Sequence, residues 1–313
     1  MAKAKRRLDP VRIRLALLLI VFFIIGVVGV LHYTGIMPLG ELLIRAGLRD
    51  KPAVNADTQV HFVDVGQGDC TVVMSADKVM VIDSGERDGS NTAVNYLKKL
   101  GVRRIDILIA THPHSDHIGE MDSIIESFEI GQFIMPEIPK KYVPATRVYE
   151  DMLQALKTKG LKARKARDET FELGECRVQT FTSHLKDEEN LNNYSVLVKI
   201  THGENSFLVT GDCEKAEEAD LIQRDAQLRS KVLRTGHHGS STSSSAEFLD
   251  RVLPRYAVIS CGRKNDYGHP DEDTVDRLRK YADKLYITSK DGTVVFYSDG
   301  EGITVKCEQG EKK

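Results

Sequence analysis

The stretch THPHSDH (Thr111–His117) follows directly after the apolar run IDILIA (Ile105–Ala110). Three imidazoles and a carboxylate within six residues form a donor set that suits a borderline divalent metal ion. The apolar run is typical of a buried strand and a helical pattern follows, so the turn between them can direct these side chains into one pocket. A solvated histidine cluster on the surface is a poorer interpretation. We therefore predict metal ligands at His112, His114, Asp116 and His117.

Two further apolar strands end in potential metal ligands. The segment SFLVTGD ends at Asp212, and the segment KVLRTGHH ends at His237 and His238. Taken alone, an aspartate after a strand is commonly a turn residue or a helix N-cap, and adjacent histidines are often structural. Together with the first cluster, they supply a bridging carboxylate and one more imidazole. The sequence therefore predicts a second ion, bound by Asp212 and one histidine of the pair.

The composition is that of a folded domain. Hydrophobic residues make up 41% and charged residues 29% of the 313 residues, which excludes a disordered, collagenous or polytopic membrane chain. The five cysteines are widely spaced and include no CxxC pair, so we expect neither a disulfide framework nor a thiolate zinc site.

Short β-rich runs come in clusters between single helical patterns from residue 60 onward. Strands are predicted at residues 60–65, 71–74, 78–83, 104–110, 132–135, 176–181, 194–200, 206–210, 231–235, 256–260, 284–288, 292–297 and 302–306, and helices at 90–100, 117–128, 145–159, 216–225, 246–251 and 271–281. This order favours a layered α/β domain with a mixed sheet, whose loops gather at one edge.

Residues 15–31 (LALLLIVFFIIGVVGVL) carry no charged side chain. A helix of this length spans roughly 25 Å, near the lower limit for crossing the hydrocarbon layer of a bilayer. Six basic residues precede the run and no lysine or arginine follows until Arg45, so the positive-inside rule places the N-terminus in the cytoplasm. A cleaved signal peptide is the alternative, although no Ala-x-Ala-like site follows. We expect a single-pass anchor in the cell membrane and an extracytoplasmic body.

The chain is accordingly divided into a basic cytoplasmic head (1–14), a transmembrane anchor (15–31), a linker (32–57), a folded domain (58–307) and a charged tail (308–313). The head carries six basic residues and one aspartate, a charge of +5, so the total of −2 leaves −7 for the remainder. A net-acidic body argues against a broad coating of nucleic acid but is compatible with a local basic groove. Candidates for such a groove near the motif loops are Lys231, Arg234, Arg263 and Lys264.

Seven segments of the body together resemble the metallo-β-lactamase-fold hydrolases and, within them, the extracytoplasmic hydrolase domain of ComEC-type competence proteins. These segments are FVDVGQGDC (Phe62–Cys70), VIDSG (Val81–Gly85), THPHSDHIGE (Thr111–Glu120), NNYSVLV (Asn192–Val198), LVTGDCE (Leu208–Glu214), GHHGSSTSSS (Gly236–Ser245) and YGHP (Tyr267–Pro270). The HxHxDH pattern identifies only the superfamily, whereas DVGQGD, GHHGS and GHP in this order are more specific to the ComEC-like branch.

The resemblance implies an α/β fold of the α+β type, a four-layer αββα metallo-β-lactamase sandwich. It also implies two divalent ions, Zn²⁺ or Mn²⁺, at one edge of the two sheets. The implied ligands are His112 and His114 for one ion, Asp116, His117 and His237 for the other, and Asp212 as the bridge between them.

The remaining motif residues are expected to support these ligands. The resemblance gives an orienting role to His238, Asp64, Asp69 and Asp83. Asn193 stands where many members of the superfamily have another metal-binding histidine. One site is therefore expected to be weaker, or more tolerant of harder ions such as Mn²⁺.

Two ions about 3.5 to 4 Å apart lower the pKa of a bridging water and supply hydroxide for in-line attack on a phosphodiester. Asp116 or Asp212 is expected to orient this hydroxide. His269 is a candidate to stabilise a phosphoryl oxygen or to protonate the leaving alkoxide, with a structural imidazole as an equal alternative. Ser240 and the serines up to Ser245 can donate to a phosphate, although capping of the following helix is the default interpretation.

We therefore expect a membrane-anchored, extracytoplasmic, metal-dependent hydrolase, a phosphodiesterase or nuclease that acts on DNA. A separate DNA-uptake channel is a candidate partner, because one apolar segment cannot itself conduct DNA. A hydrolase of cell-envelope polymer esters, or of lactones or lactams, is the first alternative. A non-catalytic binding module that has kept the fold is the second. The oligomeric state is left open.

Overall fold

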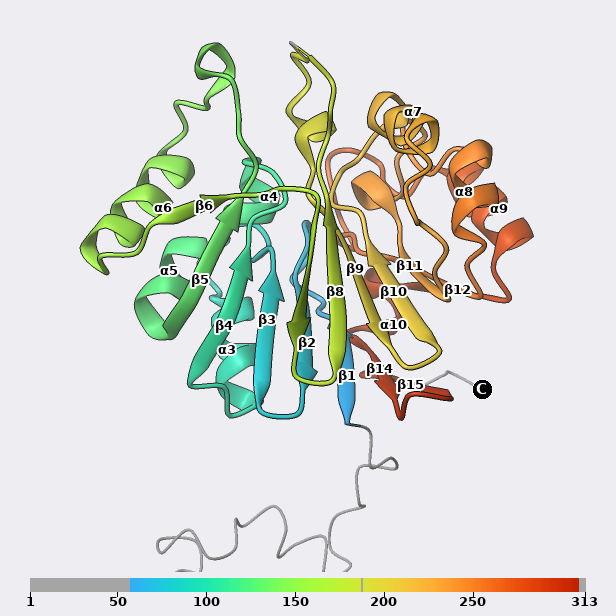
Figure 1. The fold of residues 1–313 in the computed structure, drawn as a ribbon, viewed down its shortest axis with the longest axis horizontal. Helices are drawn as coiled ribbons and strands as arrows, with labels where there is room; N and C mark the ends of the chain where they lie inside the picture. Colours follow the sequence, from blue (N-terminus) through green and yellow to red (C-terminus); the bar gives the residue numbers. More distant parts are fainter. Residues whose placement is uncertain (1–56, 187, 310–313) are drawn as a thin grey trace, which may run out of the picture. The chain divides into compact units, whose positions relative to one another are not determined.

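The computed structural model describes residues 57–186 and 188–309, whose strands form two sheets (Figure 1). Along the chain, the first sheet comprises β1 (Thr58–Phe62), β2 (Thr71–Ser75), β3 (Lys78–Ile82), β4 (Arg104–Ile109), β5 (Glu129–Met135), β6 (Ala163–Lys165), β14 (Val294–Ser298) and β15 (Ile303–Cys307). The second comprises β7 (Glu169–Leu173), β8 (Cys176–Phe181), β9 (Leu197–His202), β10 (Asn205–Val209), β11 (Val232–Arg234), β12 (Tyr256–Ile259) and β13 (Lys284–Ile287). Their spatial orders are β15-β14-β1-β2-β3-β4-β5-β6 and β13-β12-β11-β10-β9-β8-β7.

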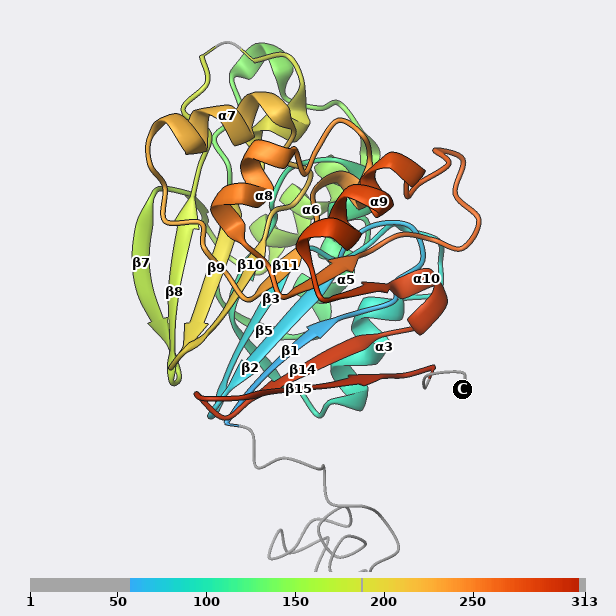
Figure 2. The same cartoon turned by 90° about the vertical axis from the view of Figure 1, so that its right-hand side faces the viewer.

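Helices cover the outer face of each sheet. Those on the first sheet are α3 (Thr92–Lys99), α4 (Ser115–Ile118), α5 (Met121–Ser127) and α6 (Arg147–Thr158). Those on the second are α7 (Lys215–Gln223), α8 (Ala246–Val252) and α9 (Glu272–Tyr281), seen in front of the sheet in Figure 2. The short helix α10 (Thr288–Asp291) connects β13 to β14, and three 3-10 turns lie at Lys140–Tyr142, Leu191–Tyr194 and Gly236–Gly239.

Three buried apolar clusters hold these layers together. Leu97 and Met152 belong to the cluster between the first sheet and its helices, and Phe248 to the cluster on the far side of the second sheet. Between the sheets, Phe207 and Phe296 pack edge to face with ring centroids 6.1 Å apart. Each fully buried side chain of this size contributes about 1.5 to 3 kcal/mol. The expectation of a mixed α/β domain with two sheets is therefore confirmed.

Parallel strands direct the motif loops to one edge of the domain. Strands β3 to β6 run parallel to one another, and so do β10 to β13. Because the carboxyl ends of parallel strands meet at one edge, the loops that follow them are brought together. Asp83 follows β3, the HxHxDH segment follows β4, Asp212 follows β10, and His237 and His238 follow β11. In Figure 1 this edge lies at the top.

The structure departs from the predicted elements in two places. Strands β6 and β7 were not predicted because each is the edge strand of its sheet and has mostly exposed or half-buried, charged residues in place of an apolar pattern. The helix predicted at residues 117–128 is two helices, since the chain turns at Gly119 and Glu120. Gly119 donates its backbone N–H to the carbonyl of Gly85 at 2.8 Å, and a Cβ atom there would collide with that backbone.

None of the helices in the described part of the chain is both long and apolar enough to cross a bilayer. The anchor predicted at residues 15–31, and the head and linker on either side of it, lie outside the described residues. The first described strand begins at Thr58 and the last ends at Cys307.

The turn at Gly68 packs directly against the HxHxDH segment, which makes this glycine testable. Gly66 and Gly68 both have positive φ, +78° and +115°, but a Cβ atom at Gly68 would collide with the carbonyl oxygen of Asp116, whereas one at Gly66 meets open space. Gly66→Ala therefore incurs only backbone strain of about 1 kcal/mol. Gly68→Ala adds overpacking of about 1 to 3 kcal/mol. We expect thermal midpoints lowered by about 3 °C and about 10 °C, respectively. Equal midpoints for the two variants would contradict this packing.

Candidate metal centre

His117 is fixed at the start of α4 by a carboxylate behind it. Its Nδ1 lies 2.7 Å from Oδ2 of Asp83, whose other oxygen accepts the backbone N–H of Thr111 at 2.8 Å. Asp83 has φ of +61°, in the left-handed region that aspartate tolerates better than most residues. With Nδ1–H donated to Asp83, the Nε2 atom of His117 faces the centre of the site, where it would bind a metal ion once its proton is lost.

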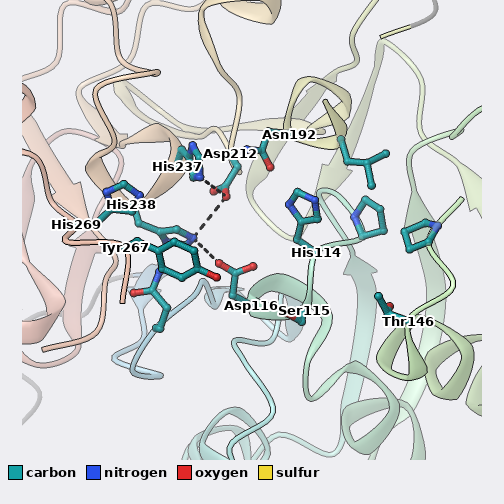
Figure 3. A pocket seen from close by; sticks show the side chains of 14 residues that line it. His114, Ser115, Asp116, Thr146, Asn192, Asp212, His237, His238, Tyr267 and His269 are labelled. Carbon is teal, nitrogen blue, oxygen red and sulfur yellow. Dashed lines mark hydrogen bonds and ion pairs between the residues drawn. The ribbon is translucent and has the colours of Figure 1, made fainter. Parts of the chain in front are cut away.

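Asp212 lies at that centre. It is buried, and its backbone N–H donates to Oγ of Ser195 at 2.9 Å, which positions the loop after β10. Its Oδ1 lies 3.1 Å from Nε2 of His117. Its Oδ2 lies within reach of three further Nε2 atoms, at 3.5 Å from His238 and at 3.8 Å from both His112 and His237. One carboxylate therefore faces imidazoles from loops of both sheets. Figure 3 shows its contacts with His237 and His238.

His112 and His114 form one side of the site. Nε2 of His112 and Nδ1 of His114 are 3.1 Å apart, and Oγ1 of Thr111 lies 3.2 Å from Nδ1 of His112. Burial lowers the pKa of both histidines, with the neighbouring His117 acting in the same direction. Both imidazoles are therefore neutral at physiological pH, which is the form that binds a metal ion.

The adjacent histidines both have positive φ, 46° for His237 and 53° for His238, and their rings have different partners. His238 is buried, with Nδ1 2.9 Å from the carbonyl oxygen of Ser260 and Nε2 3.0 Å from Oδ2 of Asp116. His237 is partly exposed, and its Nδ1 lies 2.9 Å from Oε1 of Glu214. The geometry therefore favours His238 as the ligand beside Asp116, in place of the predicted His237.

Asp69 takes part in the cluster more closely than predicted. Four buried side chains each place one potential ligand atom within 4.8 Å of the others: those of Asp69, His117, Asp212 and His238. Asp69 is also ion-paired with the fully buried Arg234. Because this guanidinium already offsets the charge of Asp69, the carboxylate left for a cation beside His238 is Asp116.

The electrostatics of the cluster favour a cation. Burial alone would raise the pKa of Asp212, but His117 and His238 hold it well below its usual value. Conversely, burial would lower the pKa of His117, but Asp212, Asp83 and Asp116 hold it well above. Nε2 of His117 and Oδ1 of Asp212 face each other as an ion pair at 3.1 Å, and among the described residues neither atom makes a further hydrogen bond. A divalent cation would use these buried atoms and offset the carboxylates, so the residues fit a metal site.

Three residues expected at the site do not line the central cavity. Asp64 accepts the backbone N–H of Gly66 and lines a separate cavity. Asn193 does not line the central cavity, whereas Asn192 does, because the 3-10 turn at Leu191–Tyr194 presents Asn192 to that side. Ser240 accepts the backbone N–H of Thr242 within its own turn, and Ser245 caps α8. For these serines, the capping interpretation fits the structure better than phosphate binding.

The predicted basic groove is not formed by the four proposed residues. Arg234 is buried, and the Nζ atom of Lys231 donates to Oδ1 of Asn205 at 3.0 Å, at the start of β10. Arg263 lines the separate cavity with Asp64, and Lys264 is exposed but does not line the central one. The four cations are therefore dispersed over the domain.

A cavity of about 460 Å³ opens over the cluster, within the size range of small-ligand sites. Its lining includes Asp116, Asp212, His238 and His269, all predicted, but also residues that sequence reasoning missed. The missed residues include Gln67, Thr146, Asn192 and Tyr267. Gln67 and Tyr267 belong to the motifs DVGQGD and YGHP, so the motifs themselves were a usable signal for both.

Comparison with known proteins agrees with the fold. The sequence is 26% identical over 264 residues to ComE operon protein 3 of Bacillus subtilis (strain 168), covering 78% of this chain and 34% of the relative. It is 30% identical over 268 residues to competence protein ComA of Neisseria gonorrhoeae, covering 84% and 36%, respectively. The chain thus spans about a third of the length of these relatives.

Among solved structures, a mutant of the CmlA beta-hydroxylase superposes with a TM-score of 0.51 at 13% identity, over 82% of this chain and 58% of the other, which indicates a shared fold alone. The sequence profile of the metallo-beta-lactamase superfamily matches residues 63–263. The chain belongs to the metallo-β-lactamase superfamily, has a buried His/Asp cluster that fits a metal ion, and has curated homologues among the competence proteins.

Proposed function

We propose that this protein is a metal-dependent phosphodiesterase that hydrolyses DNA. The observation that carries the proposal is the position of Asp212, whose two carboxylate oxygens face imidazoles from both sheets. A carboxylate shared in this way is what a two-ion site requires. The relatives named as competence proteins support DNA as the substrate.

In this proposal each ion has its own imidazoles. His112 and His114 would hold one ion, and Asp116, His117 and His238 the other, with Asp212 shared between them. Zn²⁺ and Mn²⁺ both suit a mixed set of imidazoles and carboxylates. When bound, such a pair of ions activates a water molecule and offsets charge on the phosphate.

The side chains around the cavity have separate tasks. Oδ2 of Asp116 lies 3.0 Å from Nε2 of His238, and together with Asp212 the Asp116 carboxylate would orient the attacking water. Burial lowers the pKa of His269, and His237 acts in the same direction, so its imidazole is neutral at physiological pH. A neutral imidazole is a poor general acid but a good hydrogen-bond donor. His269 is therefore assigned to a phosphoryl oxygen and not to protonation of the leaving group.

Asp212→Asn tests the proposed activity. The substitution keeps the shape of the side chain but removes the charge that both ions would share, so we expect a loss of DNA hydrolysis on the order of 10³-fold. Turnover is measured with single- and double-stranded DNA and Mn²⁺ or Zn²⁺. The control is Asp77→Asn, which changes an exposed carboxylate in the turn between β2 and β3. Wild-type protein that leaves DNA intact but cleaves envelope polymer esters, lactones or lactams would contradict the proposal.

His238→Ala and His237→Ala form a matched pair that tests the ligand assignment. His238 is buried against Asp116 and Asp212, whereas His237 is held by Glu214. We expect His238→Ala to weaken binding of one ion by more than about 100-fold, and His237→Ala to leave both ions bound. Metal content after dialysis, measured by mass spectrometry, decides between them. The reverse pattern would restore the assignment to His237.

We also propose that residues 15–31 anchor the protein in the cell membrane, with the N-terminus in the cytoplasm and the hydrolase domain outside. The support is the uncharged run behind a basic head. In a bacterial host, the full chain should sediment with alkaline-washed membranes, whereas a variant carrying Ile20→Arg and Ile24→Arg should not, since a central arginine costs about 2.5 to 3.5 kcal/mol. A full chain found entirely in the soluble fraction would disprove the anchor. A separate DNA-uptake channel is a candidate partner only for a protein that is anchored in the same membrane.

A further inference from the structure

One aromatic side chain stands exposed at the mouth of the cavity. Four large hydrophobic side chains are exposed among the described residues, and Tyr267, at 67%, is the most exposed of them. It is also the one of the four that lines the cavity above Asp116 and Asp212. Figure 3 shows its ring at the near side of the pocket. Single exposed hydrophobic residues are common on protein surfaces, so the position of Tyr267 alone decides nothing.

What distinguishes Tyr267 is that its ring is held in place from one side. The ring is stacked on His269 at an angle of 9° with centroids 5.9 Å apart, the offset arrangement that aromatic pairs favour. His269 is itself fixed, because its backbone N–H donates to Oδ1 of Asn265 at 2.9 Å and its carbonyl accepts from Nδ2 of Asn265 at 2.7 Å. The platform is thus preorganised, which reduces the entropy lost when a further ring stacks on it.

The rest of the cavity lining offers few contacts that would bind a nucleic acid. Its lining contains the carboxylates Asp116 and Asp212 and several histidines, but no lysine or arginine among the described residues. A polymeric phosphodiester can therefore gain little affinity from cationic side chains here. Affinity for the parts of the substrate beyond the reacting phosphate has to come from another kind of contact.

We propose that Tyr267 is a stacking platform for an unpaired nucleobase, so that the preferred substrate is a single-stranded polynucleotide. The inference rests on the proposed phosphodiesterase function and names its substrate class. Every base has a π-face, so stacking on tyrosine is tolerant of sequence. Bases inside a duplex are already stacked on their neighbours and would have to unpair first, which costs a few kcal/mol.

The proposal is tested by removing the ring in Tyr267→Ala and comparing two oligomers of ten nucleotides. One is oligothymidylate, and the other has the same sugar-phosphate backbone but no bases. Binding is measured by fluorescence anisotropy with Ca²⁺, and KM and kcat with Mn²⁺. We expect Tyr267→Ala to weaken binding of the oligothymidylate about tenfold and to raise its KM by a similar factor, with kcat unchanged. Binding of the abasic oligomer should not change. Tyr267→Phe should keep wild-type affinity, whereas Tyr267→Leu should resemble Tyr267→Ala.

The matched control is Leu153→Ala, which removes an exposed apolar side chain on α6 that does not line the cavity. The platform would be overturned if Tyr267→Ala weakened binding of both oligomers equally or of neither. It would also be overturned if Tyr267→Phe bound the oligothymidylate as weakly as Tyr267→Ala does. If the wild-type protein bound both oligomers equally, the platform would also be overturned, and a phosphodiester polymer without bases would be favoured as the substrate. Binding decides the platform even if no cleavage is seen, whereas absence of cleavage counts against the proposed activity alone.

Discussion

The buried carboxylate of Asp212 is the constraint on which the rest of the site depends. It lies between His112 and His117 of one loop and the histidine pair of another. Burying an ionised carboxylate costs several kcal/mol unless positive charge and hydrogen-bond donors surround it. Among the described residues, one buried guanidinium, that of Arg234, accompanies the carboxylates of Asp69 and Asp212. The charges of this cluster balance best when cations occupy it.

A second layer of hydrogen bonds fixes the ring planes around this carboxylate. Asp83 lies behind His117, the carbonyl of Ser260 behind His238, and Glu214 behind His237. These partners sit in different loops at the ends of parallel strands, so the two sheets must pack correctly before the rings converge. Fixed ligands of this kind limit the reorganisation needed during a reaction, which is where most electrostatic catalysis originates.

Much of the architecture was predictable because burial leaves a pattern in the sequence. Strands such as β4 consist mostly of buried apolar residues, and the loops after them carry clustered metal-binding residues. The edge strands β6 and β7 lack such a pattern, since half-exposed strands tolerate charge. Sequence spacing could place the histidine pair at the site but could not decide which of the two histidines is the metal ligand. Both residues have left-handed backbone angles, and the direction of each ring depends on that turn.

The same limit applies to the choice between Asn192 and Asn193, which depends on the 3-10 turn that holds them. Asp64 belongs to the DVGQGD motif, yet it lines a separate cavity. A motif shows which residues are close in sequence but not where each side chain points. Tyr267 belongs to the YGHP motif, but the sequence indicates no role for it, since its exposure and its stacking on His269 are visible only in three dimensions.

The most direct test of this account is anomalous X-ray scattering from crystals of the protein grown with Mn²⁺. The account predicts two peaks about 3.5 to 4 Å apart, one on each side of the Asp212 carboxylate. His112 and His114 should coordinate the first, and Asp116, His117 and His238 the second. A single peak away from Asp212, or two peaks that do not share its carboxylate, would contradict the account.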